Sequence, residues 1–165
     1  MDIFYYKKER ETDYYIKKSL DFLDKDTSII RKNGKPYGNN CFIGVTHTED
    51  FILVAVEDFD FGIDCESLNR IVPNKEKIAD RYFTENERAY INEDNTRFLE
   101  IWVKKEAYTK YTGEGLSGMK NVDILCLDGC FKKLGFGDKL IYVYTDRNIE
   151  RINIENKVTG DIKNT

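Results

Sequence analysis

Two carboxylates follow an apolar stretch in the middle of the chain. Asp64 and Glu66 stand two residues apart, and residues 59–65 have the composition of a β-strand. Because side chains alternate along a strand, both carboxylates leave the same face. Taken alone the pair is typical of a solvated strand end, since charged side chains are mostly exposed. The alternative is a site for a hard cation such as Mg²⁺, which prefers oxygen ligands, and the apolar residues before Asp64 favour it.

A second pair of charged residues lies on the longest predicted helix, residues 96–111. Leu99, Val103, Glu106 and Lys110 recur at helical spacing and form one stripe, which is apolar at first and ionic at its end. The ordinary interpretation is an exposed Glu–Lys pair four residues apart, which contributes about 0.3–0.5 kcal/mol. The alternative is a helix that packs by its first part and then presents a metal-binding carboxylate and a phosphate-binding lysine.

Two further candidate residues lie earlier in the chain. Lys35 stands between Gly34 and Pro36, and His47 is the only histidine. A solvated loop lysine and a structural or surface histidine are the ordinary interpretations of such residues. Because His47 has no companion, a structural zinc site is not expected.

The elements that must position these residues alternate between strands and helices. We expect a helix at 9–23, a strand at 27–31, a turn at Asn33-Gly34, and strands at 41–45 and 51–56 that form a hairpin with His47 at its tip or strand end. Helices follow at 75–82, at 84–91 behind a Thr84–Glu87 capping box, and at 96–111 with a stop at Gly113. Strands are predicted at 122–127, 140–144 and 149–154, with a turn at Asp128-Gly129. The pattern indicates an α+β fold with mainly antiparallel strands.

The composition narrows the class of protein. The 165 residues suffice for one compact domain or two small halves, and 41% hydrophobic with 34% charged residues excludes a disordered chain. A net charge of −4 argues against binding nucleic acid or anionic membranes through global charge. No apolar stretch approaches a membrane span and the N-terminus is not a secretory signal. Four cysteines, Cys41, Cys65, Cys126 and Cys130, are interpreted as reduced, mostly buried thiols of a cytoplasmic protein.

Five short motifs in order resemble those of the 4'-phosphopantetheinyl transferase superfamily. They are GKP at 34–36, VTHT at 45–48, GIDCE at 62–66, FTENE at 83–87 and WVKKEAYTKYTGEGL at 102–116. The last block is similar to the family signature W-x-x-K-E-A-x-x-K-x-x-G-x-G-L at every defined position. Each piece is weak alone, but the ordered set, which covers about half the chain, is a strong signal.

The resemblance is closer to the surfactin-synthetase-activating type than to the short holo-acyl-carrier-protein synthase type, because 61 residues precede Gly62. It implies two similar α+β halves packed as a pseudo-dimer, with coenzyme A in the cleft between them and the long helix in the second half. We expect residues 1–58 to form a shortened first half that contacts coenzyme A phosphates. Residues 59–165 would form the second half, with the metal site and the signature helix.

The implied reaction is transfer of the 4'-phosphopantetheine arm from coenzyme A to a carrier-protein serine, with release of adenosine 3',5'-bisphosphate. Such phosphoryl chemistry depends on positioning and electrostatic stabilisation. The resemblance implies Asp64, Glu66 and Glu106 as ligands of one Mg²⁺, and Glu106, Glu66 and Lys110 as catalytic residues. Lys110 would neutralise the α-phosphate, and Glu106 would accept the serine proton directly or through a water, with Glu66 or Glu87 as other candidates. The implied coenzyme A contacts are Lys35, Thr46, His47, Lys105 and Lys110.

The expected partners are coenzyme A and an apo acyl or peptidyl carrier protein of fatty acid or secondary metabolism. Neither nucleic acid nor membrane is expected as a partner, and the two-half layout favours a monomer. The basic residues that meet the 3'-phosphate in the family have no clear counterpart here, although Lys7, Lys8, Arg10, Lys17 and Lys18 are available. Two alternatives are a non-catalytic relative that binds coenzyme A or a carrier protein, and a Mg²⁺-dependent phosphohydrolase.

Overall fold

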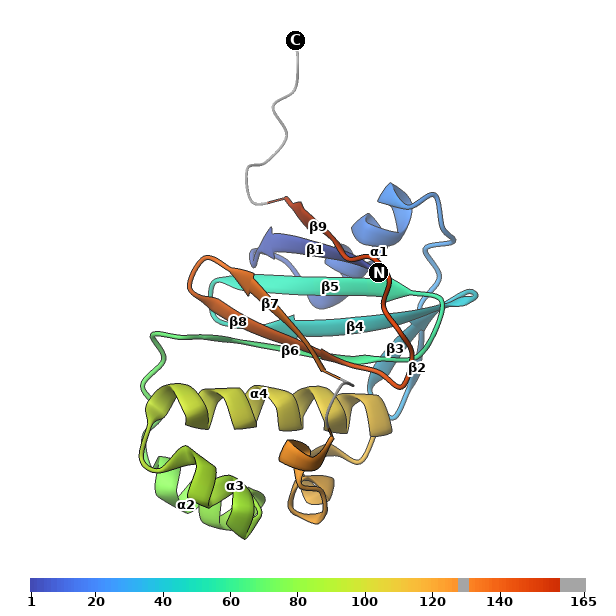
Figure 1. Cartoon of the computed structure of the whole chain (residues 1–165). Coiled ribbons are helices and arrows are strands. Elements are labelled where there is room, and N and C mark those ends of the chain that lie inside the picture. The colour runs from blue at the N-terminus through green and yellow to red at the C-terminus, as the bar shows by residue number, and fades with distance from the viewer. Residues whose placement is uncertain (128–130, 158–165) are drawn as a thin grey trace. The chain divides into compact units, whose positions relative to one another are not determined.

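The chain divides into two compact units in the computed structural model, which describes residues 1–127 and 131–157 (Figure 1). The first unit contains Met1–Asp60 together with residues 148–157, and the second is Phe61–Arg147. The sequence had placed everything after residue 58 in one half. The structure differs at the C-terminal end, because the last strand, β9 (Asn153–Asn156), hydrogen-bonds to the first strand, β1 (Asp2–Lys7).

A six-stranded sheet with the order β2-β3-β4-β5-β1-β9 makes up most of the first unit. All neighbours are antiparallel except β1 and β9, which run parallel with Ile3 opposite Ile154. The remaining elements are β2 (Ile30–Lys32), β3 (Lys35–Gly38), β4 (Cys41–His47), β5 (Phe51–Glu57) and the helix α1 (Thr12–Phe22). Buried Tyr15, Ile16 and Leu20 of α1 pack with the sheet residues Phe4, Ile43 and Val54. The predicted first helix, the Asn33-Gly34 turn and the hairpin that ends at His47 are confirmed.

The second unit combines a three-stranded antiparallel sheet with helices. The strand order is β6-β8-β7, formed by β6 (Gly62–Ser67), β8 (Lys139–Tyr144) and β7 (Phe131–Phe136). The helices are α2 (Lys75–Tyr82), α3 (Glu85–Ile91) and α4 (Asn95–Thr112), followed by the 3-10 helices η1 (Gly115–Asn121) and η2 (Ile124–Cys126). The helix α4 packs on β6 and β8. Its fully buried Leu99, Val103 and Ala107 share a core with Phe83 and Tyr142.

Local capping signals fix the ends of these helices. Thr84 and Glu87 form a reciprocal capping box at the start of α3, as predicted. The side chain of Asp94 accepts hydrogen bonds from the N–H groups of Thr96 and Arg97 at the start of α4. Gly113 ends α4 with a left-handed φ of 76°, a conformation that costs glycine little. The predicted α+β class with antiparallel sheets and a long helix in the second unit is confirmed.

Some strand predictions were wrong. Residues 122–127 contain the 3-10 helix η2, because the Asp123 side chain accepts the N–H of Leu125 and stabilises a turn there. The strand β7 was missed, since adjacent Lys132 and Lys133 interrupt any alternation of apolar and polar residues. Strands predicted at 27–31 and 149–154 lie slightly later, as β2 and β9. The Asp128-Gly129 turn lies outside the described residues.

Two general expectations can also be compared with the structure. Within residues 1–127 and 131–157, no helix combines the length and the apolar character that crossing a bilayer requires. Cys41, Cys65 and Cys126 are free thiols, the first two buried and Cys126 exposed, while Cys130 lies outside the described part of the chain.

Candidate active site

A close approach between β6 and α4 forms the base of the candidate site. A Cβ atom built on Gly62 would lie only 1.8 Å from the carbonyl oxygen of Ala107 and 2.7 Å from the backbone nitrogen of Tyr111. Only glycine therefore allows α4 to pass so near the first residue of β6. The contact brings the C-terminal half of α4 beside the two carboxylates of β6.

Lys110 on α4 meets Asp64 on β6 across this contact. The Lys110 Nζ and Asp64 Oδ1 atoms are 2.7 Å apart, and Asp64 is buried. Lys110 lies one turn beyond Glu106 on the same helix, whose Leu99 and Val103 are fully buried. The stripe on α4 thus changes from core packing to ionic contact, as its sequence indicated.

The three carboxylates oppose one another's charge. Burial, followed by the charges of Asp64 and Glu66, raises the pKa of Glu106 to about 6, although Lys110 acts in the opposite direction. Burial and the charge of Asp64 also raise the pKa of Glu66, while Arg70 lowers it through an ion pair. Glu66, Asp64 and Glu106 therefore lie within electrostatic reach of each other.

The donor set fits a hard divalent cation, because it offers carboxylate oxygens in a partly buried place where negative charge is in excess. Among the described residues, however, no three His, Cys, Asp or Glu side chains converge closely enough to hold a metal ion as they stand. In this arrangement Lys110 holds Asp64 in an ion pair, and Arg70 holds Glu66 in another. A bound cation would take over the neutralising role of these two side chains.

Glu87 and Lys105 are far more buried than the sequence indicated. Both side chains have 0% exposure and form an ion pair with 2.8 Å between Nζ and Oε2. The Lys105 ammonium also donates to the carbonyl oxygens of Met119 and Val122. This placement differs from the predicted coenzyme A contact of Lys105, because all three ammonium hydrogens are used inside the protein. For the same reason Glu87 does not remain a candidate general base.

The predicted phosphate contacts of the first unit lie on β3 and β4. Lys35 on β3 forms an ion pair with Asp60, with 2.5 Å between Nζ and Oδ1. Thr46 is buried, and His47 is exposed at the end of β4. The Nζ atom of Lys8 lies 3.4 Å from Nδ1 of His47.

Several partners of these residues were missed by the sequence argument. Arg70 follows Glu66 by four residues, and this spacing was a usable signal for an ion pair. Asp60 and Lys8 gave no local signal. Lys8 reaches His47 because β1 and β4 both pair with β5, so that Lys7 lies opposite Phe51 and His47 opposite Ile52.

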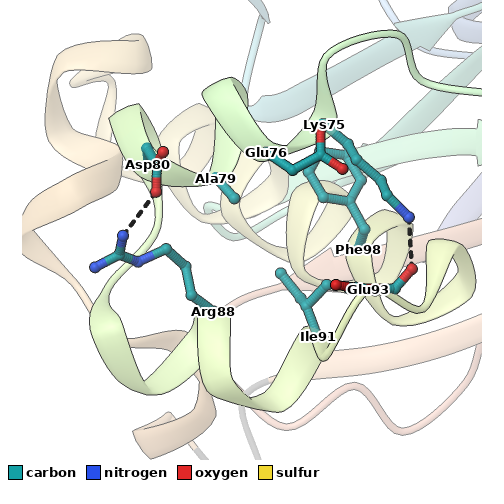
Figure 2. A pocket seen from close by; sticks show the side chains of 8 residues that line it. All are labelled: Lys75, Glu76, Ala79, Asp80, Arg88, Ile91, Glu93 and Phe98. Carbon is teal, nitrogen blue, oxygen red and sulfur yellow. Dashed lines mark hydrogen bonds and ion pairs between the residues drawn. The ribbon is translucent and has the colours of Figure 1, made fainter.

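A pocket of about 190 Å³ lies elsewhere in the second unit, between α2, α3 and the start of α4 (Figure 2). Ala79, Ile91 and Phe98 supply its apolar surface. Its two cations are engaged, since Arg88 pairs with Asp80 at 2.7 Å and Lys75 donates to the backbone carbonyl of Glu93 (Figure 2). None of the predicted site residues lines this pocket.

A sequence model of the 4'-phosphopantetheinyl transferase superfamily matches residues 60–145, which are more than half of the chain. The chain belongs to this superfamily. The resemblance predicted from the five motifs is thereby confirmed.

Its relatives are 4'-phosphopantetheinyl transferases of bacilli and related bacteria. The chain is 29% identical over 102 residues to the gsp enzyme of Aneurinibacillus migulanus, covering 57% of this chain and 42% of that one. It is 31% identical over 93 residues to psf-1 of Bacillus pumilus (52% and 39%) and 28% identical over 104 residues to Sfp of Bacillus subtilis strain 168 (56% and 45%). The matched part thus spans less than half the length of these relatives.

The superfamily match contains the whole β6–α4 site. Asp64, Glu66, Glu106 and Lys110 all lie within residues 60–145, whereas Lys35 and His47 precede them. Membership of the transferase superfamily therefore rests on the unit that carries the carboxylates.

Proposed function

We propose that this protein transfers the 4'-phosphopantetheine group from coenzyme A to a serine of an acyl or peptidyl carrier protein, releasing adenosine 3',5'-bisphosphate. The observation that carries the proposal is the ion pair of Lys110 with Asp64, with Glu66 and Glu106 within electrostatic reach of Asp64, inside the region that matches the transferase superfamily. A protein that only bound coenzyme A would not need this concentration of carboxylates beside a lysine.

Asp64, Glu66 and Glu106 would hold one Mg²⁺. When bound, the ion supplies positive charge to the pyrophosphate of coenzyme A. Burial, together with the charges of the neighbouring carboxylates, raises the pKa of Glu106 and of Glu66, and a bound cation would offset both effects.

The side chains of the second unit then have distinct tasks. The serine oxygen attacks the β-phosphorus of coenzyme A, and the bond from that phosphorus to the bridging oxygen breaks. The electron pair leaves with adenosine 3',5'-bisphosphate, whose new phosphate charge Lys110 neutralises after it exchanges Asp64 for the α-phosphate. The serine proton passes to Glu106, directly or through a water, with Glu66 as the other candidate.

Lys35, Thr46 and His47 of the first unit are proposed to contact the adenosine phosphates. Lys8 lies beside His47, and an ammonium next to an imidazole at the ends of β1 and β4 offers hydrogen-bond donors and positive charge to a dianionic phosphate. We therefore propose Lys8 as a contact of the 3'-phosphate. Lys35 would exchange Asp60 for a phosphate.

The free thiols of Cys41, Cys65 and Cys126 support a reducing compartment, and we propose that the protein acts in the cytoplasm as a monomer. The carrier protein would belong to fatty acid or secondary metabolism.

The proposal is tested by incubating the protein with coenzyme A, Mg²⁺ and several apo carrier proteins and weighing the carriers by mass spectrometry. The mass of one phosphopantetheine should be added, and Glu106→Gln should abolish the addition while the circular dichroism spectrum is retained. No addition to any carrier would overturn the proposal. Calorimetric binding of coenzyme A without transfer would favour a binding relative, and coenzyme A hydrolysis without a carrier would favour a phosphohydrolase.

The role of Lys8 is tested with two substrates. Lys8→Met should raise the KM for coenzyme A by about tenfold, which corresponds to one charged hydrogen bond, but leave the KM for 3'-dephospho-coenzyme A unchanged. Lys25→Met, which changes an exposed lysine that follows α1 and is not among the candidates for this contact, is the matched control. Equal effects of Lys8→Met on both substrates would remove Lys8 from the 3'-phosphate site.

A further inference from the structure

The buried ion pair between Glu87 and Lys105 is the most unusual feature of the second unit outside the carboxylate site. Neither side chain is exposed, and each polar atom of the pair has partners. Glu87 Oε1 accepts the N–H of Ile124 at 2.9 Å, and Oε2 accepts the N–H of Thr84 at 2.8 Å in addition to the Lys105 ammonium.

This pair connects parts of the unit that are distant in sequence. Glu87 belongs to the first turn of α3, and Lys105 lies in the middle of α4. Their other partners belong to the chain that follows α4: Met119 lies in η1, Ile124 begins η2, and Val122 lies between the two. The pair therefore joins the segment 115–126 to both α3 and α4, in addition to the hydrogen bond from Asn86 to Asp123 and the packing of Ile124 in the core. Figure 1 shows this segment beside the later turns of α4.

Stability alone gives a weak reason for such a pair. Removing two charges from water is costly, and apolar residues of similar volume often replace buried ion pairs at no cost in stability. An ion pair, unlike apolar contacts, holds its side chains in one relative orientation, because each hydrogen bond has a preferred direction. Burial also lowers the pKa of Lys105, an effect that Glu87 opposes.

The part of α4 that the Glu87–Lys105 pair holds in place is next to the carboxylate site. Lys105 immediately precedes Glu106, and successive residues of a helix point about 100° apart. When Lys105 is held toward Glu87, the rotation of α4 about its axis is set at the level where Glu106 and Lys110 face Asp64. A small rotation there would move Glu106 and Lys110 relative to β6.

We propose that Glu87 and Lys105 are positioning residues for phosphopantetheine transfer, which set the rotation of α4 and the register of residues 115–126 so that Glu106 and Lys110 meet Asp64. The inference rests on the proposed function. It assigns the pair no contact with substrate.

The test compares two double variants that each remove an ion pair. Glu87→Gln with Lys105→Gln removes both charges but keeps side-chain donors and acceptors in place. Arg88→Gln with Asp80→Asn removes an exposed ion pair between α3 and α2 and is the control. Because a displacement of about 1 Å can cost about a hundredfold in rate, we expect kcat to fall by about tenfold or more in the first variant and to stay unchanged in the control. The KM for coenzyme A should change by less than about threefold, since the phosphate contacts remain.

Amide hydrogen exchange supplies a second readout that does not depend on activity. In the Glu87→Gln/Lys105→Gln protein, exchange should accelerate in residues 115–126, while the amides of β8 stay protected. A folded variant with unchanged kcat, or with uniformly faster exchange, would overturn the proposal. If this variant does not fold, Lys105→Gln replaces it, because Glu87 then keeps two backbone donors, the N–H of Thr84 at the start of α3 and the N–H of Ile124 at the start of η2. A failure of both to fold would also overturn the proposal, since the pair would then be required for the fold itself. Wild-type protein that transfers nothing to any carrier would instead refute the proposed function.

Discussion

Glu106 lies in surroundings that oppose its negative charge. Burial and the neighbouring carboxylates of Asp64 and Glu66 raise its pKa to about 6, and only Lys110 lowers it. A proton and the proposed Mg²⁺ would therefore compete for the same oxygens. This competition would make metal binding sensitive to pH in a range where most carboxylates are fully ionised.

Binding of Mg²⁺ should weaken as the solution becomes more acidic. Below about pH 6 Glu106 is increasingly protonated in the metal-free protein, so the Mg²⁺ concentration for half-maximal transfer should rise by up to about tenfold per pH unit. The measurement is a series of Mg²⁺ titrations of the transfer rate between about pH 7.5 and about pH 5.5. A half-maximal concentration that does not change across this range would contradict the assignment of Glu106.

The same environment predicts an effect on stability. The pKa of Glu106 is higher in the folded protein than its ordinary value of 4.5. The folded state therefore binds more protons, and this contribution to stability is lost as pH rises from about 4.5 to about 6. In EDTA at about pH 7.5, Glu106→Gln should raise the free energy of unfolding by about 1–2 kcal/mol, and the gain should shrink at about pH 4.5. Urea denaturation at both pH values measures the free energy of unfolding of the wild type and of the variant. A variant that is less stable than the wild type at the higher pH would show that burial and the neighbouring carboxylates do not disfavour ionised Glu106.

The contact between β6 and α4 involves residues that stood out in the sequence, and their roles as metal ligands and catalytic groups stay predictions. Asp64 and Glu66 were recognisable from strand alternation, and Glu106 and Lys110 from helical spacing, because both are local patterns. Lys105 was misplaced, since it occupies the same signature as Glu106 but points about 100° away, into the protein. Its partners at 119 and 122 come from a segment whose structure was predicted wrongly.

At the scale of elements, the site depends on how closely α4 approaches β6. Gly62 has no side chain that would hold α4 and β6 apart, and a Cβ atom added at this position would overlap the carbonyl oxygen of Ala107. A backbone atom cannot move aside as a flexible side chain does. The distance between the two elements, and with it the Lys110–Asp64 contact, is therefore set by one residue.

Gly62→Ala should consequently destabilise the protein by about 1–3 kcal/mol or more, as overpacked cores do, and reduce transfer activity. Gly135→Ala is the matched control, because a Cβ on this residue of β7 meets nothing within 4 Å. Chemical denaturation of both variants gives the comparison. Equal stability of the two would mean that α4 and β6 are not in close contact.

The capping box of α3 gives a second test at this scale. Thr84→Ala removes the oxygen that accepts the Glu87 N–H at 3.2 Å, and should cost about 1 kcal/mol of unfolding free energy. Thr84→Ser keeps that oxygen and should stay within about 0.5 kcal/mol of the wild type. If thermal or urea unfolding does not separate Ala from Ser, the cap contributes no stability.

Helix ends were predicted better than strands for a physical reason. A cap or a stop involves residues within one or two turns, as at Thr84 and Gly113. A strand exists only through its neighbours, and β7, with adjacent lysines, becomes a strand because β8 pairs with it. The local sequence of such a segment does not show that it will pair with another strand.

At the scale of the whole molecule, the two units differ in how the chain builds them. The second unit is one continuous stretch, Phe61–Arg147, and coincides closely with the superfamily match at residues 60–145. The first unit needs two stretches, because β9 lies beside β1. The motifs indicated the long helix of the second unit and its carboxylates. The sequence pattern did not indicate that β9 pairs with β1, about 150 residues earlier.

Ending the chain after Arg147 should therefore affect the first unit. β1 would lose its parallel neighbour, including the hydrogen bond from the Lys157 N–H to the Tyr5 carbonyl oxygen. We expect amide exchange in β1 to accelerate by about tenfold or more, equivalent to about 1.4 kcal/mol, with the amides of α4 as an internal reference. Unchanged protection of β1 would show that β9 does not stabilise this sheet.

The placement of β9 also has a consequence for synthesis on the ribosome. β1 leaves the ribosome before the second unit, but the strand that completes its sheet is made only after all of Phe61–Arg147 has been translated. The unit with the carboxylates can fold as soon as it emerges, since it is built from one continuous stretch. The sheet of the first unit is therefore completed only after the second unit has been made, and until then β1 presents an open strand edge to its surroundings.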